Sequence, residues 1–266
     1  MKTIEESVVT AMDGSEREIF PFLPYILQDF WEIGTSPEII INLVKKHAKN
    51  FSRLKVLDLG CGKGAVSVKL AHEIKCNCLG IDAIKEFIDD ANKKAEEYKV
   101  DSLCRFEVGD IRLKVKELSD YDIIILGAIG PVFGNYYETL TTVTNCLKNE
   151  GLIIIDDGYI EGSSTFNHPL MLRKQELLQQ IKMANMQLVD EVTGNQLEGI
   201  ENGYEQEFDY IKSRCKELIE KYPEKASLFK NYMDNQREEY DVLESKVICS
   251  AMVITKNKTS YTIVSK

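Results

Sequence analysis

The segment VLDLGCGKG, residues 56–64, constrains this chain more than any other stretch of its sequence. A run of apolar residues reaches Leu59, glycines follow at positions 60, 62 and 64, and an amphipathic stretch then begins. Glycine allows positive φ where a strand turns sharply into a helix, and it removes side chains that would keep a ligand from the backbone. The free N–H groups at the start of the helix attract a carboxylate or a phosphate. The segment therefore predicts a strand–turn–helix unit with a binding site in its turn.

Apolar runs rich in β-branched residues alternate with amphipathic stretches from residue 54 to residue 157, which is typical of strand–helix–strand units in a parallel sheet. Helices are expected at residues 37–48, 65–74, 84–98, 136–147 and 168–183. Strands are expected at residues 55–59, 77–82, 104–108, 121–126, 151–156, 187–192 and 247–255. The right-handed crossover rule places helices on both faces of such a sheet. We therefore predict an α/β fold, a three-layer sandwich around a doubly wound, mostly parallel, seven-stranded sheet.

Regions outside this core predict a lid and an insertion. The leader around residues 20–25 is aromatic and contains two prolines, and Ser36 before Pro37 is expected to cap a helix. This leader either covers the carboxyl edge of the sheet as a lid or packs against the core. Two apolar stripes at helical spacing, separated by Pro223, predict two helices before the last strand. We predict one domain with an N-terminal helical lid (1–50), a cofactor-binding core (51–193), a helical insertion (194–245) and a final strand (246–266).

The charge of the chain bears on its partners. The formal net charge is −10 at pH 7, whereas nucleic-acid binding needs a basic surface, so we expect no nucleic-acid partner. Between residues 190 and 244 the sequence holds 15 acidic and 7 basic side chains. That local excess either attracts a cationic small molecule or forms a solvated helical surface.

The sequence contains no indication of a membrane span or of a secretory signal. No stretch approaches the 18 consecutive apolar residues that indicate a membrane span, and residues 1–6 lack the apolar part of a secretory signal. We therefore expect a cytoplasmic protein with reduced cysteines, and no membrane partner.

Three carboxylates lie beside the glycine turn in the expected sheet. Asp82 ends the second strand, and its two acceptor oxygens match the separation of a ribose diol. Asp110 closes the third strand, where an adenine amino group is expected. The spacing from Gly60 also satisfies the dinucleotide fingerprint. Asp58, however, would repel a pyrophosphate and attract the ammonium group of an amino-acid cofactor.

These motifs, in this order, resemble those of the class I S-adenosylmethionine (SAM)-dependent methyltransferases. The resemblance is carried by residues 56–64, 80–82, 108–110, 121–124 and 147–155. It implies SAM as the cofactor and a seventh strand that runs antiparallel to its neighbours. The sequence GTSPE at residues 34–38 is similar to the leader of small-molecule methyltransferases, in which such a segment closes over the cofactor.

The resemblance also implies a role for each matching position. The glycine turn lies against the methionine part, Asp82 binds the ribose, Ala83 and Ile84 lie along the adenine, and Asp110 with Ile111 meets its amino edge. The expected cofactor-binding residues are Asp58, Gly60, Cys61, Gly62, Gly64, Asp82, Ala83, Ile84, Gly109, Asp110, Ile111, Gly127 and Ala128.

The acceptor is expected to be a small molecule. Residues 126–131 lack the polar and aromatic tetrad of the DNA amine methylases. Methyl transfer by in-line displacement needs alignment and exclusion of water rather than a universal catalytic residue. His168, as a base or a surface residue, and Tyr159 are candidate catalytic side chains.

The acceptor pocket has three further candidates. Tyr25, Trp31 and Gly34 belong to the leader, and the aromatic ones either attract the sulfonium by cation–π contact or pack in the core. The pair at residues 156–157 resembles the magnesium ligands of catechol-type enzymes, but Gly127 stands where a further acid is needed, so we expect no metal.

Two other functions stay open. The first alternative is an NAD-binding oxidoreductase, and the second is a SAM-binding sensor protein without transferase activity. A solvent-shielded cavity beside the methyl position would favour the enzyme, and a pocket filled by side chains would favour the sensor. We expect a monomer or a homodimer.

Overall fold

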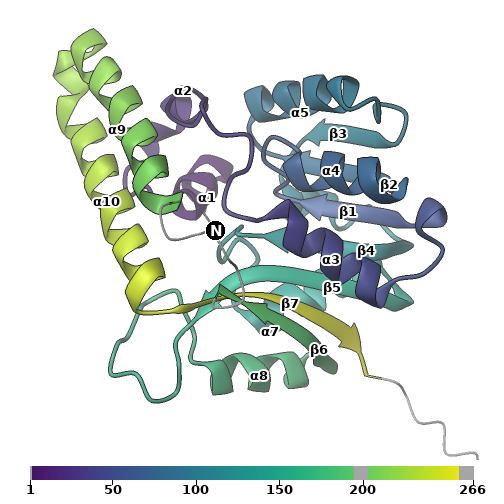
Figure 1. Ribbon diagram of the computed structural model, residues 1–266. Coiled ribbons are helices and arrows are strands. Elements are labelled where there is room, and N and C mark those ends of the chain that lie inside the picture. Colours follow the sequence, from purple (N-terminus) through teal and green to yellow (C-terminus); the bar gives the residue numbers. More distant parts are fainter. Residues whose placement is uncertain (1, 195–202, 258–266) are drawn as a thin grey trace, which may run out of the picture.

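A computed structural model describes residues 2–194 and 203–257, and its centre is one seven-stranded sheet (Figure 1). The strand order is β3-β2-β1-β4-β5-β7-β6, and the first five strands in that order pair in parallel. β7 runs antiparallel to both β5 and β6, as the resemblance implied. The strands are β1 (Lys55–Leu59), β2 (Asn77–Asp82), β3 (Cys104–Val108), β4 (Tyr121–Gly127), β5 (Leu147–Tyr159), β6 (Met186–Thr193) and β7 (Ile248–Lys256). The predicted sheet is confirmed.

The helices follow the predicted periodicity closely. They are α1 (Ile4–Ala11), α2 (Leu23–Ile26), α3 (Pro37–His47), α4 (Ala65–Ile74), α5 (Lys85–Glu97), α6 (Ile111–Lys114), α7 (Tyr136–Val143), α8 (Lys174–Met183), α9 (Gly203–Lys221) and α10 (Ala226–Ser245). Within the described residues, no helix is both long and apolar enough to cross a membrane.

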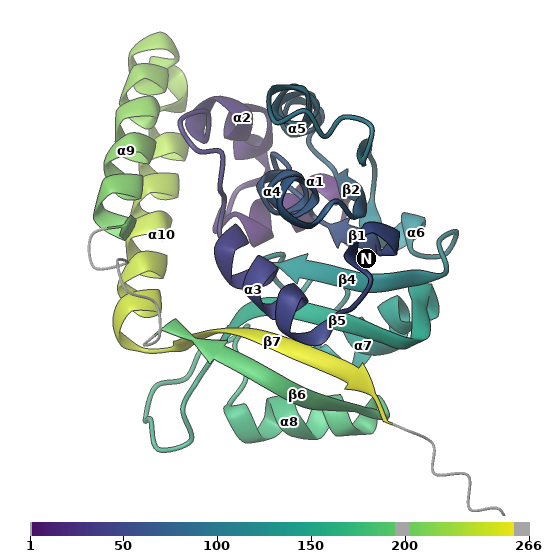
Figure 2. The same cartoon turned by 45° about the vertical axis from the view of Figure 1, so that its right-hand side comes forward.

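The sheet separates two apolar layers (Figure 2). α3, α4 and α5 pack on one face, and α6, α7 and α8 pack on the other. Side chains of β4 alternate between these layers: Ile123 and Ile125 join the first, and Ile124 and Leu126 join the second, all at most 1% exposed. Each such side chain stabilises the fold by about 1.5–3 kcal/mol relative to an exposed one. A central strand buried on both faces explains the unbroken apolar run at residues 123–126.

A third apolar cluster lies beyond the carboxyl ends of the parallel strands. It joins α1, α2, the start of α5 and the α9–α10 hairpin, with Leu23, Phe87 and Phe229 fully buried at its centre. Figure 1 shows α1 and α2 between the hairpin and the sheet. α3, by contrast, packs against α4 and the sheet, so only the part of the predicted lid before α3 lies over this edge. The division of the chain at residues 50, 193 and 245 stays a prediction, and its parts at 195–202 and 258–266 fall outside the described residues.

Three local predictions were wrong. The helix expected at residues 136–147 ends at Val143, and Leu147 is already the first residue of β5. Helix α8 begins at Lys174 instead of residue 168, because residues 172–174 pair with Ile160: its N–H donates to Leu172 O (2.8 Å), and Lys174 N–H donates to Ile160 O (3.1 Å). Ser36 occupies the cap position of α3, but its hydroxyl donates to Glu38 (3.3 Å) and makes no bond to the helix backbone.

Candidate functional site

A cavity of about 630 Å³ opens at the carboxyl ends of the parallel strands. Its wall includes the turn after β1, the ends of β2, β3, β4 and β5, the N-terminal leader, and residues of α9 and α10. Ligands of open α/β sheets bind at this edge, where the strand ends and helix N-termini leave polar groups free. The cavity is therefore the candidate site.

The glycine turn after β1 forms one side of the cavity. Gly60 and Gly62 have φ of 76° and 51°, and the N–H groups of Gly60 and Cys61 donate to Ile81 O (2.8 and 3.1 Å). A Cβ built on Gly62 would meet nothing within 4 Å, so its backbone faces open space. A Cβ on Gly64 would lie 2.8 Å from Phe106, and Gly64 does not border the cavity. Gly62 thus opens the site, whereas Gly60 makes room for Ile129 and Gly64 for Phe106.

Asp82 joins the glycine turn to the end of β2. One carboxylate oxygen accepts from Gly62 N–H (2.9 Å) and the other from Ile84 N–H (2.8 Å). Burial raises the pKa of Asp82 above its ordinary value. Each oxygen retains a lone pair that can accept from a hydroxyl group. The carboxylate is fixed in place and still suited to a diol.

Asp58 lies beneath the same turn. Its Oδ2 accepts from Ser67 Oγ of α4 (2.7 Å), and burial raises the pKa of Asp58 to about 6. The neighbouring Cys61 thiol is held neutral because burial raises its pKa well above the ordinary value. Two buried carboxylates, Asp58 and Asp82, thus stand within the turn, an arrangement that favours a cation over a pyrophosphate.

Asp110 is tied to a neighbour that the sequence did not indicate. The guanidinium of Arg112 donates to both carboxylate oxygens (2.7–3.1 Å), and this contact lowers the pKa of Asp110. The same guanidinium donates to Ser7 Oγ and Lys2 O (both 3.0 Å). Asp110 therefore holds α1 against the end of β3, and its expected contact with an adenine amino group stays a prediction.

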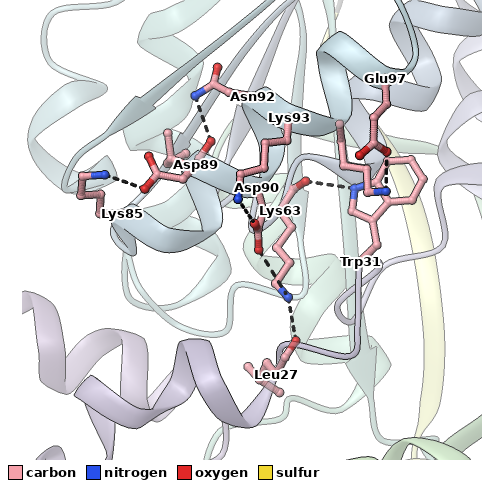
Figure 3. A network of polar contacts seen from close by, with 11 residues as sticks. Leu27, Trp31, Lys63, Lys85, Asp89, Asp90, Asn92, Lys93 and Glu97 are labelled. Atoms are coloured by element: carbon pink, nitrogen blue, oxygen red, sulfur yellow. Dashed lines mark hydrogen bonds and ion pairs between the residues drawn. The ribbon is translucent and has the colours of Figure 1, made fainter.

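Lys63 holds the second half of the leader against the glycine turn (Figure 3). Its ammonium donates to Leu27 O (2.7 Å), and its backbone carbonyl accepts from the indole of Trp31 (3.1 Å). Lys63 is only 4% exposed, and burial lowers its pKa; Asp90, 3.8 Å away, partly compensates its charge. A lysine in a glycine turn gives no sequence sign of such a structural role.

Thr35 closes the cavity between the ends of β4 and β5. A Cβ on Gly127 would lie 2.5 Å from Thr35 Oγ1, so only glycine admits this threonine. Thr35 is 5% exposed, and its hydroxyl has no hydrogen-bond partner in the described part of the chain. On the adjacent strand, burial raises the pKa of Asp156 to about 7. An unpaired hydroxyl beside a buried carboxyl is a natural place for a polar ligand group.

Residues 50–259 match the family model described as "Methyltransferase domain". The chain belongs to this methyltransferase family.

Individual relatives support the same assignment over shorter stretches. The release factor glutamine methyltransferase of Buchnera aphidicola is 42% identical over 64 residues, which are 24% of this chain and 23% of the relative. The ubiquinone biosynthesis O-methyltransferase of Rickettsia typhi is 27% identical over 121 residues, 44% and 46% of the two chains. The chain thus spans about half, or less, of the length of these curated relatives.

A solved structure shares the whole fold. The SAM-dependent methyltransferase from Geobacter sulfurreducens, in complex with S-adenosyl-L-homocysteine, has a TM-score of 0.72 and 18% identity. The match covers 89% of this chain and 98% of that one. At this identity the likeness establishes the fold.

Most of the residues predicted for a methyltransferase site border the cavity. These are Trp31, Gly34, Asp58, Gly60, Cys61, Gly62, Asp82, Ala83, Gly109, Asp110, Ile111, Gly127, Ala128 and His168. His168 lies in the loop before α8, where its Nδ1 accepts from Leu170 N–H (3.3 Å) and its ring stacks on Phe166.

Four predicted residues do not border the cavity: Gly64, Ile84, Tyr25 and Tyr159. Ile84 is 3% exposed and packs behind Asp82 in the third cluster. The Tyr25 hydroxyl turns outward to Glu217 of α9. Tyr159 pairs with β7 and is 3% exposed, with its hydroxyl accepting from Lys174 (2.9 Å). Tyr159 thus lies off the cavity wall, although its neighbour Gly158 borders the cavity.

The adjacent carboxyl groups of Asp156 and Asp157, near the end of β5, have different neighbours. Asp157 accepts from the hydroxyl of Tyr136 (2.8 Å) and from Gly158 N–H (2.7 Å), while Asp156 pairs in register with Gly127. Residues 2–194 and 203–257 contain no group of three side chains arranged to hold a metal ion.

Proposed function

We propose that this chain transfers a methyl group from SAM to a small-molecule acceptor. One observation carries the proposal: a single cavity starts at the open backbone of Gly62 and continues past the end of β5 to α10. Its volume of about 630 Å³ leaves room for a second ligand beside the cofactor. Membership of the methyltransferase family supports the same reaction.

The residues around the turn suit the proposed cofactor. The remaining lone pairs of Asp82 accept from the ribose hydroxyls, and the free oxygen of Asp58 faces the ammonium group. The open Gly62 backbone admits the amino-acid part. When bound, SAM supplies a methyl group made electrophilic by its sulfonium.

The chain itself aligns the acceptor and excludes water. The leader, held by Lys63 and by Arg112, covers the cavity from the side opposite the strands. Asp156 borders the acceptor side, and with a pKa of about 7 it can take a proton from an acceptor that must lose one. We propose Asp156, ahead of His168, as this base.

The two alternatives receive less support. Asp58 and Asp82 in the turn disfavour the pyrophosphate of a dinucleotide. A sensor without transferase activity would be expected to fill the acceptor side with side chains, whereas the cavity extends through it. Two predictions stay open: that the chain acts on no nucleic acid, and that it is a monomer or a homodimer.

Isothermal titration tests the proposal directly. S-adenosylhomocysteine (SAH), the demethylated product, is expected to bind the full-length chain at micromolar concentration, and NADH is expected to release no heat. Heat with NADH and none with SAH would favour the oxidoreductase. Incubation of a metabolite mixture with methyl-labelled SAM then separates an enzyme from a sensor, because only the enzyme moves the label.

A further inference from the structure

The wall of the cavity includes five acids and four tyrosines, and we call the part of the cavity that they line the acidic lobe. Its five carboxyl groups come from four places in the sequence: Asp13, the pair Asp156 and Asp157, Glu207 and Glu239. Its aromatic side chains are Tyr136, Tyr204, Tyr232 and Tyr240. Residues from the N-terminal leader, the end of β5 and both helices of the insertion thus meet in one pocket.

The carboxyl groups of the acidic lobe have little compensating charge. Burial raises the pKa of Asp13 and of Asp156 to about 7, and it also raises the pKa of Glu207 and of Glu239. The charge of Glu239 raises the pKa of Asp13 further. A buried carboxylate without a cation is unfavourable, so a ligand that brings a positive charge is favoured here.

The basic side chains that border the cavity do not compensate the charge of the acidic lobe. Among the described residues these are Lys63, Arg112 and His168. Lys63 is bound to the leader and Arg112 to Asp110, both on the cofactor side. His168 lies close enough to lower the pKa of Glu239, but burial outweighs its effect.

The four tyrosines border the same space. Tyr204 and Tyr240 are stacked with ring centroids 5.0 Å apart, and the Tyr240 hydroxyl donates to Glu207 (3.2 Å). Tyr136 donates to Asp157 (2.8 Å). Aromatic faces combined with carboxylates are a recurring way to bind an ammonium group, because the ring quadrupole and the formal charge act together.

A third observation is independent of charge. The hydroxyl of Thr35 is 5% exposed and borders the cavity beside Asp156. It makes no hydrogen bond of normal geometry within the described residues, although it lies close enough to Asp156 to lower the pKa of that carboxyl in part. Buried hydroxyls nearly always have a partner, so a bound polar molecule is the expected one.

We propose that the methyl acceptor is a small molecule that carries an ammonium group, and that the acidic lobe binds this group. The atom that receives the methyl group must carry a lone pair, so it is either another atom of the acceptor or the nitrogen itself after Asp156 has taken its proton. This inference rests on the proposed function, because it names the acceptor class for the same cavity. Carboxylates supply the charge complement, and the tyrosines supply the apolar walls.

The test uses probes that differ only in charge. The SAH-saturated chain is titrated with choline and its neutral isostere 3,3-dimethylbutanol, and with the set tyramine, tyrosol and 4-hydroxyphenylacetate. We expect the cation of each set to bind at least tenfold more tightly than its neutral partner, and the carboxylate to bind most weakly. Preference for a neutral or anionic probe, binding of Mg²⁺ in place of the amines, or no cation binding in either set would overturn the inference.

Variants locate the binding group. Glu239→Gln and Asp156→Asn should each weaken cation binding about tenfold and leave the neutral probes within twofold. Glu238→Gln is the matched control, since Glu238 is the exposed neighbour on α10 and lies off the cavity wall. Equal losses in E239Q and E238Q would show general surface attraction instead of a site.

SAH binding separates the two proposals. If SAH binds normally while charge makes no difference to the probes, the acceptor class is wrong and the transferase proposal stands. If SAH does not bind the wild-type chain, the transferase proposal fails, whatever the amines do.

Discussion

The two halves of the cavity are built in different ways. On the cofactor side, the backbone of residues 60–62 and two carboxylates within 25 residues of each other define the surface. On the acceptor side, the surface consists of side chains from positions as far apart as Asp13 and Glu239. A site made of backbone and nearby residues is fixed by a short motif, whereas a site made of distant side chains depends on the whole tertiary arrangement.

The largest effect expected from this difference lies at Asp82. Asp82→Ala should weaken SAH binding by about 1.5–3 kcal/mol for each lost bond to the charged carboxylate. Isothermal titration measures the loss, with Asp89→Ala on the exposed face of α5 as the control. Because Ala also leaves two backbone N–H groups unpaired, Asp82→Asn should be compared, and unchanged affinity in both variants would contradict the ribose contact.

Substitutions at two glycines of the turn should have opposite effects, one mainly on the stability of the fold and the other mainly on SAH binding. Gly64→Ala places a methyl group against Phe106 and Ala91 at positive φ, so we expect the free energy of unfolding to fall by roughly 2–4 kcal/mol. The methyl group of Gly62→Ala meets no atom within 4 Å, so the free energy of unfolding should fall by only about 1–2 kcal/mol. SAH binding, by contrast, should be lost. Urea unfolding and titration of both variants test this reversal; equal effects of the two changes would remove the distinction.

Lys63 links the two halves through the leader. Lys63→Met leaves the Leu27 carbonyl without its donor, which corresponds to about 1–3 kcal/mol. We expect faster hydrogen exchange in residues 27–36 and weaker SAH binding. Lys85→Met, which removes only a contact to Asp89 on the exposed face of α5, is the control. Identical exchange in the two variants would mean that Lys63 does not hold the leader.

The smallest effect is expected from pH. Asp13 has a pKa of about 7 in the fold and an ordinary value of 3.8, so between these values the folded state binds more protons than the unfolded state. Stability without ligand should therefore fall as pH rises from 5 to 8, by on the order of 1–2 kcal/mol for this group. Asp13→Asn keeps an oxygen for Gln236 and should flatten the curve, whereas a parallel curve for the variant would assign the effect elsewhere.

Much of the fold followed from periodicity alone. β1, β2 and β3 have the predicted bounds. The central strands β1 and β4 are largely apolar runs buried on both faces, whereas the edge strand β3 alternates, with Cys104 and Phe106 buried and Arg105 exposed. The start of α8 could not be predicted, because the pairing of residues 172–174 with Ile160 is a long-range contact. Ser36 shows likewise that a capping residue can be drawn to another partner.

The sequence predicted the residues of the site only where they lie close together along the chain. The sequence predicted the acids around the glycine turn. Thr35 and Lys63 lie within the GTSPE and VLDLGCGKG segments, but nothing in these segments indicates their contacts with Gly127 and Leu27, which meet them only in the fold. Tyr159 looked suitable because it follows the end of the predicted fifth strand. β5 in fact continues through Tyr159, which pairs with β7 and turns its hydroxyl to Lys174.

The third apolar cluster ties the α9–α10 hairpin to the leader, while the sheet keeps its own two layers. Substrate choice and cofactor use can therefore diverge separately during evolution. A chimaera that exchanges the leader together with the hairpin keeps their shared packing, so it should acquire the donor protein's acceptor preference. Its affinity for SAH should match that of the host only if the new leader keeps the contacts that Leu27 and Trp31 make with Lys63.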